Sequence, residues 1–358
     1  MWCFYKKYMN HEVSIHIGEQ LTLPPMDFET IQNPWGPSPQ LRENQDRVGP
    51  VSEENLIRHI GDWLSIDPRS VTLGANGSTE IINLIPKLFV RPDSNCVIVT
   101  PTYFGLYESL KSSGNPITAI QTHENAGFAY DDSVISHLFS VSAHLKPSLT
   151  WFCTPNNPTG VTLDPDVIDR FAQKNPETLV VVDEAYQEIV DPKNCRSMIR
   201  HIDNRPNILV TKTFSKAWGL PEIKIGIAIG HKSLIEKIKH HNGRPAIHAE
   251  SLVLAEASLL DTDHLEETAK RMKSELAYVH THISAMKHIK LGSQSETGVC
   301  IIRHDRIHID DALKRVNIRS LNCDLVRDLE GLGYVRIGLQ THEKNMQLIS
   351  RLWQLDSL

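Results

Sequence analysis

The 358-residue sequence has no run of apolar residues that approaches the roughly 18 needed to cross a membrane. Its first residues, MWCFYKKYM, lack the charged and then apolar order that is typical of a secretory signal peptide. No charge of one sign dominates, because 37 basic and 43 acidic side chains leave a formal net charge of −6. Neither a membrane partner nor a nucleic-acid partner is therefore expected.

Cysteines are few and scattered, and no two of them form a C-x-x-C pair. The six are Cys3, Cys96, Cys153, Cys195, Cys300 and Cys323. In a chain of this length, such a distribution favours reduced thiols and a cytoplasmic location. The 18 histidines raise the question of a metal site. Pairs such as His240 and His241 stand in polar, helix-like surroundings, so we predict no metal.

Short β-branched segments alternate with helical patterns through the middle of the chain. Six segments are apolar on both faces and are predicted to be strands: 96–99, 117–120, 149–152, 179–182, 208–210 and 225–229. Between them, 164–174 and 56–64 repeat apolar residues at helical spacing, and Ser52 is placed to cap the second helix. This alternation predicts an α/β fold, with a mostly parallel sheet and helices on both faces.

The pattern changes after about residue 240. Helices are predicted at 249–260, 264–287 and 343–352, and strands near 299–303 and 334–337. This grouping predicts a smaller α+β domain.

The first fifty residues are rich in proline and cannot form a core of their own. We predict an extended arm that docks on the second domain or on a partner subunit. The predicted divisions are an N-terminal arm at 1–48 that joins the small domain, a large domain at 49–242 and a small C-terminal domain at 243–358.

Polar and aromatic residues follow the predicted strands, at the sheet edge where α/β proteins bind ligands. The strings are TPTYFG at 100–105, TPNNPTG at 154–160, DEAY at 183–186 and TKTFSK at 211–216, with GANGST at 74–79 before a helix. This edge should therefore present an amide, a carboxylate, a phenol, a lysine and a helix N-terminus.

Three of these strings carry a resemblance. PNNPTG at 155–160, DEAY at 183–186 and SK at 215–216 resemble, in order and spacing, the motifs of class I and II aminotransferases of fold type I. Within that family the sequence is most similar to the histidinol-phosphate aminotransferase group. The resemblance extends from about Asn33 to Arg336. It implies pyridoxal 5′-phosphate (PLP) as the cofactor and an active site at the interface of a homodimer.

The resemblance implies a role for each matching residue. Lys216 would be the catalytic lysine, which bonds to the cofactor aldehyde and, once freed, carries a proton. Asp183 would keep the pyridine nitrogen protonated, while Asn157 and Tyr186 would hydrogen-bond the ring oxygen. Tyr103 would lie against the face of the ring.

The cofactor's phosphate calls for anion-binding groups. A predicted helix start favours an anion, and hydroxyls flank the lysine, so the candidates are Ser78, Thr79, Thr213 and Ser215. Lys224 stands where the family usually has an arginine, and it keeps the charge without the two-pronged fork. A second departure is the absence of a tyrosine near 46–50, where the histidinol-phosphate group usually offers one to the partner subunit's phosphate.

Substrate recognition is expected from three residues. Arg336, in the string YVRIG, fits the arginine that holds the substrate carboxylate in the family. Trp35, in NPWGP, would offer an apolar wall, and Arg244 could contact a side-chain group of the substrate.

The sequence therefore predicts an aminotransferase that passes the α-amino group of an amino acid to a 2-oxo acid. Alternatives remain on the same scaffold: a decarboxylase, as in threonine-phosphate decarboxylases, or an elimination, cyclisation or oxidation enzyme of specialised biosynthesis, for example on arginine-derived substrates. The two departures in phosphate binding count against a housekeeping role in histidine synthesis. A non-catalytic protein is disfavoured, because both Lys216 and Asp183 are present.

Overall fold

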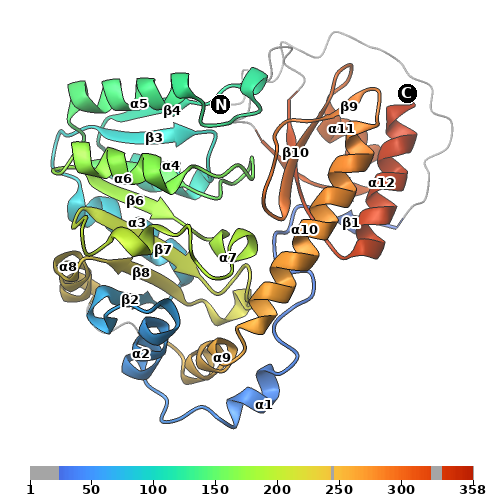
Figure 1. The fold of residues 1–358 in the computed structure, drawn as a ribbon. Coiled ribbons are helices and arrows are strands. Elements are labelled where there is room, and N and C mark those ends of the chain that lie inside the picture. The colour runs from blue at the N-terminus through green and yellow to red at the C-terminus, as the bar shows by residue number, and fades with distance from the viewer. Residues whose placement is uncertain (1–23, 243–245, 324–332, 358) are drawn as a thin grey trace.

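The computed structural model describes residues 24–242, 246–323 and 333–357. A larger α/β body and a smaller α+β body lie side by side, and α10 (Asp263–Ser284) extends from one to the other (Figure 1). The α/β fold class and the smaller α+β unit predicted from the sequence are confirmed.

The larger body is built on a seven-stranded sheet. In spatial order its strands are β2 (Val71–Gly74), β8 (Gly226–Gly230), β7 (Ile208–Thr213), β6 (Leu179–Asp183), β5 (Leu149–Cys153), β3 (Cys96–Thr100) and β4 (Ile117–Gln121). Neighbours are parallel from β7 to β4, whereas β8 is antiparallel to both β2 and β7. All six predicted strands are present, and β2 is a seventh that the sequence pattern does not predict.

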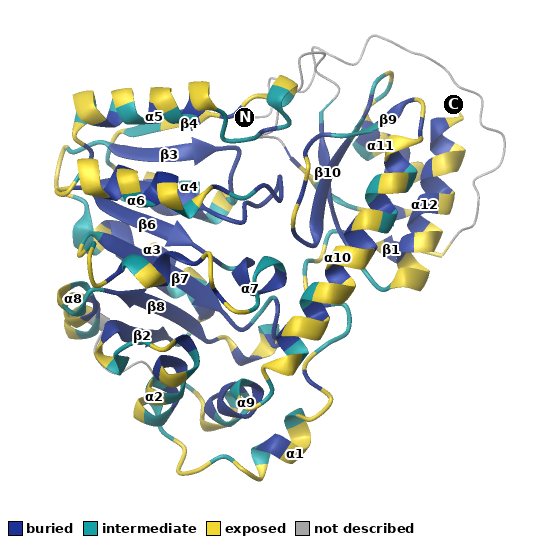
Figure 2. Cartoon of the chain, viewed as in Figure 1, coloured by how far each residue is buried: buried dark blue, intermediate teal, exposed yellow. Residues whose placement is uncertain are grey.

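Six of the seven strands are buried on both faces because each face packs against helices, and the edge strand β4 is partly exposed (Figure 2). In β6, Val180 and Val182 belong to one apolar cluster, and Val181 belongs to the other. This is the alternation that a two-residue period requires. The helices sharing the cluster of Val181 are α3 (Gly77–Phe89), α4 (Phe104–Ser112) and α8 (Lys232–Asn242). The other cluster includes residues of α2 (Glu53–Leu64), α5 (Asp132–Leu145) and α6 (Pro165–Lys174), among other helices.

Two helix starts follow from local sequence. Ser52 accepts a hydrogen bond from the backbone N–H of Asn55 at 3.1 Å, which confirms the predicted cap of α2. Asp164 caps α6 in the same way, through the N–H of Asp166 at 3.0 Å.

The smaller body contains an antiparallel sheet. Its strands, in spatial order, are β12 (Leu321–Asn322), β13 (Val335–Gly338), β10 (Val299–His304) and β9 (Ile289–Leu291). The helices beside it are α10, α11 (Ile309–Arg315) and α12 (His342–Asp356). Residues of β10 and β13 share an apolar cluster with the strands of the larger body, so one core is continuous between the two.

The N-terminal segment contacts both bodies. Strand β1 (Met26–Asp27) pairs in parallel with β11 (Ile318–Arg319) of the smaller body. Helix α1 (Leu41–Gln45) packs against α9 (Ala249–Leu259), which in turn packs against α2. The remaining short elements are η1 (Pro68–Ser70), η2 (Glu124–Ala126), α7 (Gln187–Val190), η3 (Met198–His201) and η4 (Pro221–Ile223).

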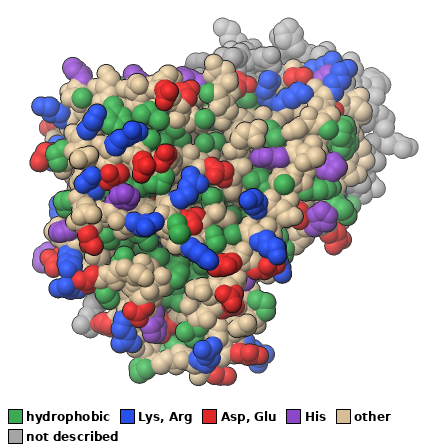
Figure 3. All heavy atoms as spheres, viewed as in Figure 1, with side chains coloured by type: hydrophobic (Ala, Val, Ile, Leu, Met, Phe, Trp, Pro, Cys, Tyr) green, Lys and Arg blue, Asp and Glu red, His purple; other side chains and the backbone are tan. Residues whose placement is uncertain are grey.

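Basic and acidic side chains are interspersed on the face shown in Figure 3. Among the helices of the described ranges, none is both long and apolar enough to span a membrane.

Candidate active site

The carboxyl ends of β5, β6 and β7 meet at one edge of the large sheet. In their parallel register Cys153 pairs with Asp183, and Asp183 pairs with Thr211. Thr211 Oγ1 donates a hydrogen bond to Asp183 Oδ1 at 2.8 Å. The adjacent strand ends therefore bring a buried carboxylate to the centre of the edge.

Asp183 is 3% exposed, and its environment sets its charge. Burial raises the pKa of Asp183 to about 6, although the hydrogen bonds from Thr211 and from the N–H of Ala185 lower it. The charge of Glu184 raises it further, and that of Lys216 lowers it. A cationic ligand group at this carboxylate would therefore favour its ionised form.

Lys216 is partly buried and faces Asp183 and two cations. Burial, the charge of Arg336 and that of Lys224 lower the pKa of Lys216 to about 8, while the charge of Asp183 opposes the shift. The Nζ donates a hydrogen bond to the carbonyl of Ile31 at 2.9 Å and lies 5.6 Å from the centroid of the Tyr186 ring. With this pKa, about one-tenth of the amine is neutral at pH 7, far more than for an ordinary lysine, and a nucleophile or base requires the neutral form.

Two tyrosines flank the lysine and the carboxylate. Tyr186 is 3% exposed, and burial raises its pKa well above the usual range. Burial also raises the pKa of Tyr103, which lies within reach of the charge of Asp183. The Tyr103 ring packs on Gly105, where an added Cβ would lie 2.6 Å from the ring. Glycine at this position therefore makes room for the ring.

Arg336 on β13 reaches across from the smaller body. Its Nη1 donates to Asn157 Oδ1 at 3.0 Å, and its Nη2 donates to the carbonyl of Glu29 at 2.6 Å. The side chain is 6% exposed, and its Nε is buried with no hydrogen-bond partner among the described residues. A buried guanidinium held only by neutral oxygens is suited to bind an incoming carboxylate.

The start of α3 is the candidate anion site. Gly77, with φ of +69°, opens the helix, and its N–H donates to the carbonyl of Lys224. A Cβ on Gly226 would lie 2.4 Å from the carbonyl carbon of Gly77, so glycine allows the helix start to sit against β8. Ser78 and Thr79 follow in the first turn, whose N–H groups favour an anion.

The other anion-site candidates lie at the end of β7 or in the segment that follows it. Thr213 Oγ1 donates to Ser215 Oγ at 3.0 Å, so the two hydroxyls lie together. Lys224 is exposed and has a left-handed backbone, with φ of +54°. Its charge acts on Lys216, which places it within electrostatic range of the site.

The three predicted substrate residues have different placements in the structure. Arg336 lies in the site, as described. Trp35 is partly buried, and the guanidinium of Arg271 on α10 lies 5.8 Å from its ring centroid. Contact of Trp35 with a substrate stays a prediction. Arg244 lies outside the described residues.

Sequence reasoning missed three groups of the site. Thr211 could have been found, because aligning β6 with β7 in parallel register places it beside Asp183. The carbonyls of Ile31 and Glu29, which accept from Lys216 and Arg336, have no side-chain signal in the sequence.

The sequence profile described as "Aminotransferase class I and II" matches residues 39–352. This chain belongs to that family. Among its relatives, a histidinol-phosphate aminotransferase of Caldicellulosiruptor saccharolyticus is 26% identical over 329 residues, which are 90% of this chain and 89% of that protein. The family prediction is confirmed.

Solved structures share the fold of this aminotransferase family member. The histidinol-phosphate aminotransferase of Clostridium acetobutylicum has a TM-score of 0.81 at 22% identity, over 93% of this chain and 99% of the other. A decarboxylase of Sulfurospirillum multivorans has a TM-score of 0.80 at 18% identity, over 94% and 96%. PLP fold type I is therefore confirmed, and proteins named for two different reactions share it.

Proposed function

We propose that this protein is a PLP-dependent aminotransferase that transfers the α-amino group of an amino acid to a 2-oxo acid. The observation that carries the proposal is the surroundings of Lys216. Its amine has a lowered pKa of about 8 and shares one site with a buried carboxylate, Asp183, and a buried guanidinium, Arg336. The family assignment supports both the reaction and the cofactor.

The residues present fit PLP. The cofactor has an aldehyde, a basic ring nitrogen, a phenolic oxygen and a phosphate, and the site offers a partner for each. Asp183 is a buried carboxylate with no ion-pair partner among the described residues, so it is available to a protonated ring nitrogen. When bound, PLP supplies an aldehyde that bonds to amines and a ring that accepts the electron pair left at the substrate Cα.

Each side chain then has a defined task. Neutral Lys216 accepts a proton from the substrate Cα and returns it, as a general base and acid. Asp183 holds a negative charge opposite the ring nitrogen. Asn157 and Tyr186 are assigned to the phenolic oxygen and Tyr103 to the ring face.

Phosphate binding is assigned to the start of α3 and to the hydroxyls and cation near it: Ser78, Thr79, Thr213, Ser215 and Lys224. The lysine contributes charge without a bidentate fork, so the hydroxyls and the helix N-terminus carry more of the binding than they would beside an arginine.

The substrate carboxylate is assigned to Arg336, whose buried Nε has no protein partner among the described residues. Forming that hydrogen bond removes an unsatisfied buried donor, which favours substrates with an α-carboxylate over simple amines. Trp35 and Arg244 are proposed as contacts of the substrate side chain.

We also infer a C2 homodimer in the cytoplasm, with an arm at 1–48, a large domain at 49–242 and a small domain at 243–358. The cytoplasmic location is supported by four described cysteines that form no disulfide: Cys96, Cys153, Cys195 and Cys300. The dimer is supported by the family and by an N-terminal segment that has little core of its own.

The test is to mix the purified, PLP-loaded protein with a panel of amino acids and follow the cofactor spectrum and the products. Transamination converts the cofactor to its amine form and yields an oxo acid, and a 2-oxo acid then restores the original spectrum. Release of CO₂, ammonia or peroxide, or formation of a cyclised product, would contradict transamination and indicate one of the other reactions on this scaffold.

A further inference from the structure

A cluster of buried charge lies behind Asp183, on residues that the proposed reaction does not use. Lys212 on β7 is 1% exposed, and its Nζ makes three polar contacts. The partners are Glu184 Oε2 at 2.9 Å, Glu188 Oε1 at 2.8 Å and Asn194 Oδ1 at 2.8 Å. These use all three protons of the ammonium group. A buried ion network stabilises a fold no better than well-packed apolar residues, so stability alone does not account for it.

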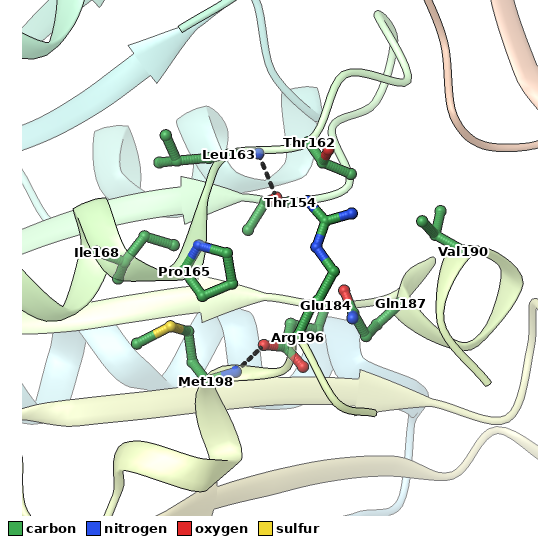
Figure 4. A pocket seen from close by; sticks show the side chains of 10 residues that line it. All are labelled: Thr154, Thr162, Leu163, Pro165, Ile168, Glu184, Gln187, Val190, Arg196 and Met198. Atoms are coloured by element: carbon green, nitrogen blue, oxygen red, sulfur yellow. Dashed lines mark hydrogen bonds between the residues drawn. The ribbon is translucent and has the colours of Figure 1, made fainter. Parts of the chain in front are cut away.

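Glu184 is also held by the loop that follows α7. Its Oε1 accepts a hydrogen bond from the backbone N–H of Met198 at 2.7 Å, and its Oε2 accepts one from Ser197 Oγ. Figure 4 shows the Glu184 carboxylate meeting the Met198 N–H where this loop passes the strand ends. The buried Glu184 carboxylate is thus held by Lys212 on β7 and by two hydrogen bonds from the loop.

The network is directly connected to the site. Asp183 precedes Glu184 in the chain, and Thr211, which donates to Asp183, precedes Lys212. The N–H of Glu184 donates to the carbonyl of Thr211 at 2.9 Å. Neighbouring side chains of a strand point to opposite faces of the sheet. Thr211 therefore contacts Asp183 on one face, and Lys212 contacts Glu184 on the other, so both residues join the end of β7 to the end of β6.

The charges of the network bear on Asp183. Two carboxylates and one ammonium give a net charge of −1. The charge of Glu184 raises the pKa of Asp183, and the ammonium of Lys212 offsets that charge. Without the ammonium, the charge beside Asp183 would be −2, and Asp183 would take up a proton more readily.

Four other titratable groups face Asp183 from the surrounding elements. They are Tyr103 at the start of α4, Cys153 at the end of β5, Tyr186 before α7 and Lys216 after β7. Burial raises the pKa of the two phenols and the thiol above their ordinary values, so these groups are neutral at pH 6. Lys216, with a pKa of about 8, is charged at that pH. Among these protein groups, only Asp183 titrates near pH 6. The second pKa of the PLP phosphate also lies at about 6 and is the same for every variant, so the effect on Asp183 is read as a difference between the midpoints of the variants.

We propose that Lys212 is a positioning residue that holds the Asp183 carboxylate in place and in its ionised form. Its ammonium neutralises the charge of Glu184 and ties the Glu184 side chain to β7, on the face of the sheet opposite to Asp183. The inference rests on the proposed function, because it takes Asp183 as the partner of the PLP ring nitrogen.

The test measures the dissociation constant of PLP for the full-length protein between about pH 5 and pH 8. In the unmodified protein, affinity should fall as the pH drops through about 6, because protonated Asp183 loses its charge-assisted bond to the ring nitrogen. A separate change in PLP affinity near pH 8 reflects the titration of Lys216, so the Asp183 midpoint is read below that pH.

The lower pH midpoints of the variants should follow a fixed order. Lys212→Met makes the network charge −2 and should raise the lower midpoint by about one pH unit. Glu184→Gln makes it zero and should lower the midpoint. The double variant restores −1 and should return the midpoint close to that of the unmodified protein. Lys193→Met is the matched control: this exposed lysine of the same loop pairs with Glu266 in solvent, where screening removes any effect on Asp183.

The outcomes distinguish failure of this proposal from failure of the proposed function. A folded Lys212→Met protein, judged by circular dichroism, with an unshifted midpoint would overturn the proposal. If that variant does not fold, Glu184→Gln decides, since a midpoint at or above that of the unmodified protein also overturns it. If the unmodified protein does not bind PLP at any pH, the proposed function fails instead.

Discussion

At the scale of single residues, the proposed chemistry depends on the amine of Lys216. Its pKa of about 8 lies below the ordinary lysine value, so the neutral fraction grows as the pH rises through 8. We expect the rate of PLP attachment to follow that rise. Lys216→Ala should abolish covalent attachment with the fold intact, because the side chain is a covalent partner rather than part of the core.

Borohydride reduction followed by peptide mass spectrometry measures this attachment directly, and circular dichroism checks the fold. A folded Lys216→Ala protein that still shows the visible band of lysine-bound PLP and still turns over would contradict the assignment.

Lys224 carries a second prediction at this scale. Its side chain is exposed and its backbone is already left-handed, so Lys224→Ala removes the charge without adding a new backbone strain. Loss of a charge-assisted bond to phosphate should weaken PLP binding by about 1–2 kcal/mol, and Lys224→Arg should bind as well or better. Equilibrium dialysis measures both.

Lys232→Ala is the control for this experiment, because Lys232 is a surface lysine that pairs with Asp67. If both Lys224 variants hold PLP as tightly as the unmodified protein does, another group binds the phosphate.

Most charged and aromatic groups of the site could be predicted from the sequence, because short motifs carry them. Asp183, Tyr186 and Lys216 follow strands that their apolar residues reveal. The carbonyls of Ile31 and Glu29 could not be predicted, since a main-chain oxygen has no sequence signature and its position depends on how a distant segment packs.

At the scale of elements, strands buried on both faces were predictable, since a continuous apolar run distinguishes them. The reversed direction of β8 was not, because its residues look the same in either orientation. The arm was predicted to dock on the second domain or on a partner. Strand β1 does pair with β11 of the smaller body, through backbone bonds to which side-chain patterns give little guide.

The segment that follows β1 carries a prediction about how the elements are tied together. Asn33 is 5% exposed, and its Nδ2 donates to the carbonyl of Ala217 at 2.9 Å and to Thr268 Oγ1 of α10 at 3.1 Å. It thus joins the residue after Lys216 to α10, two positions from the carbonyl that accepts from Lys216. Asn33→Ala should lower the free energy of unfolding by about 1–3 kcal/mol and raise KM for the amino acid.

Urea unfolding and steady-state kinetics measure the two effects. Gln32→Ala is the control, since Gln32 is exposed and should change neither. An Asn33→Ala protein of unchanged stability and KM would show that the segment is held by other contacts.

At the scale of the whole molecule, the site draws on both bodies and on the N-terminal segment. Arg336 comes from the smaller body, Asn157 and Lys216 from the larger, and the carbonyls of Glu29 and Ile31 from the segment between. A change in the relative position of the bodies would alter the Arg336–Asn157 contact, so the proposed role of Arg336 predicts that substrate binding depends on domain position.

The last prediction concerns assembly. Phe104 is 59% exposed and lies beside Tyr103, with their ring centroids 5.1 Å apart, so a large apolar side chain is open to solvent next to the proposed site. A second copy that covers this edge would remove it from water, and a C2 arrangement would do so on both copies. An obligate interface buries about 2,000 Å² or more, which keeps a dimer together at micromolar concentration. Light scattering should therefore give about 81 kDa, twice 40.4 kDa. Phe104→Asp should weaken the dimer, whereas a fully active 40 kDa monomer would overturn the prediction.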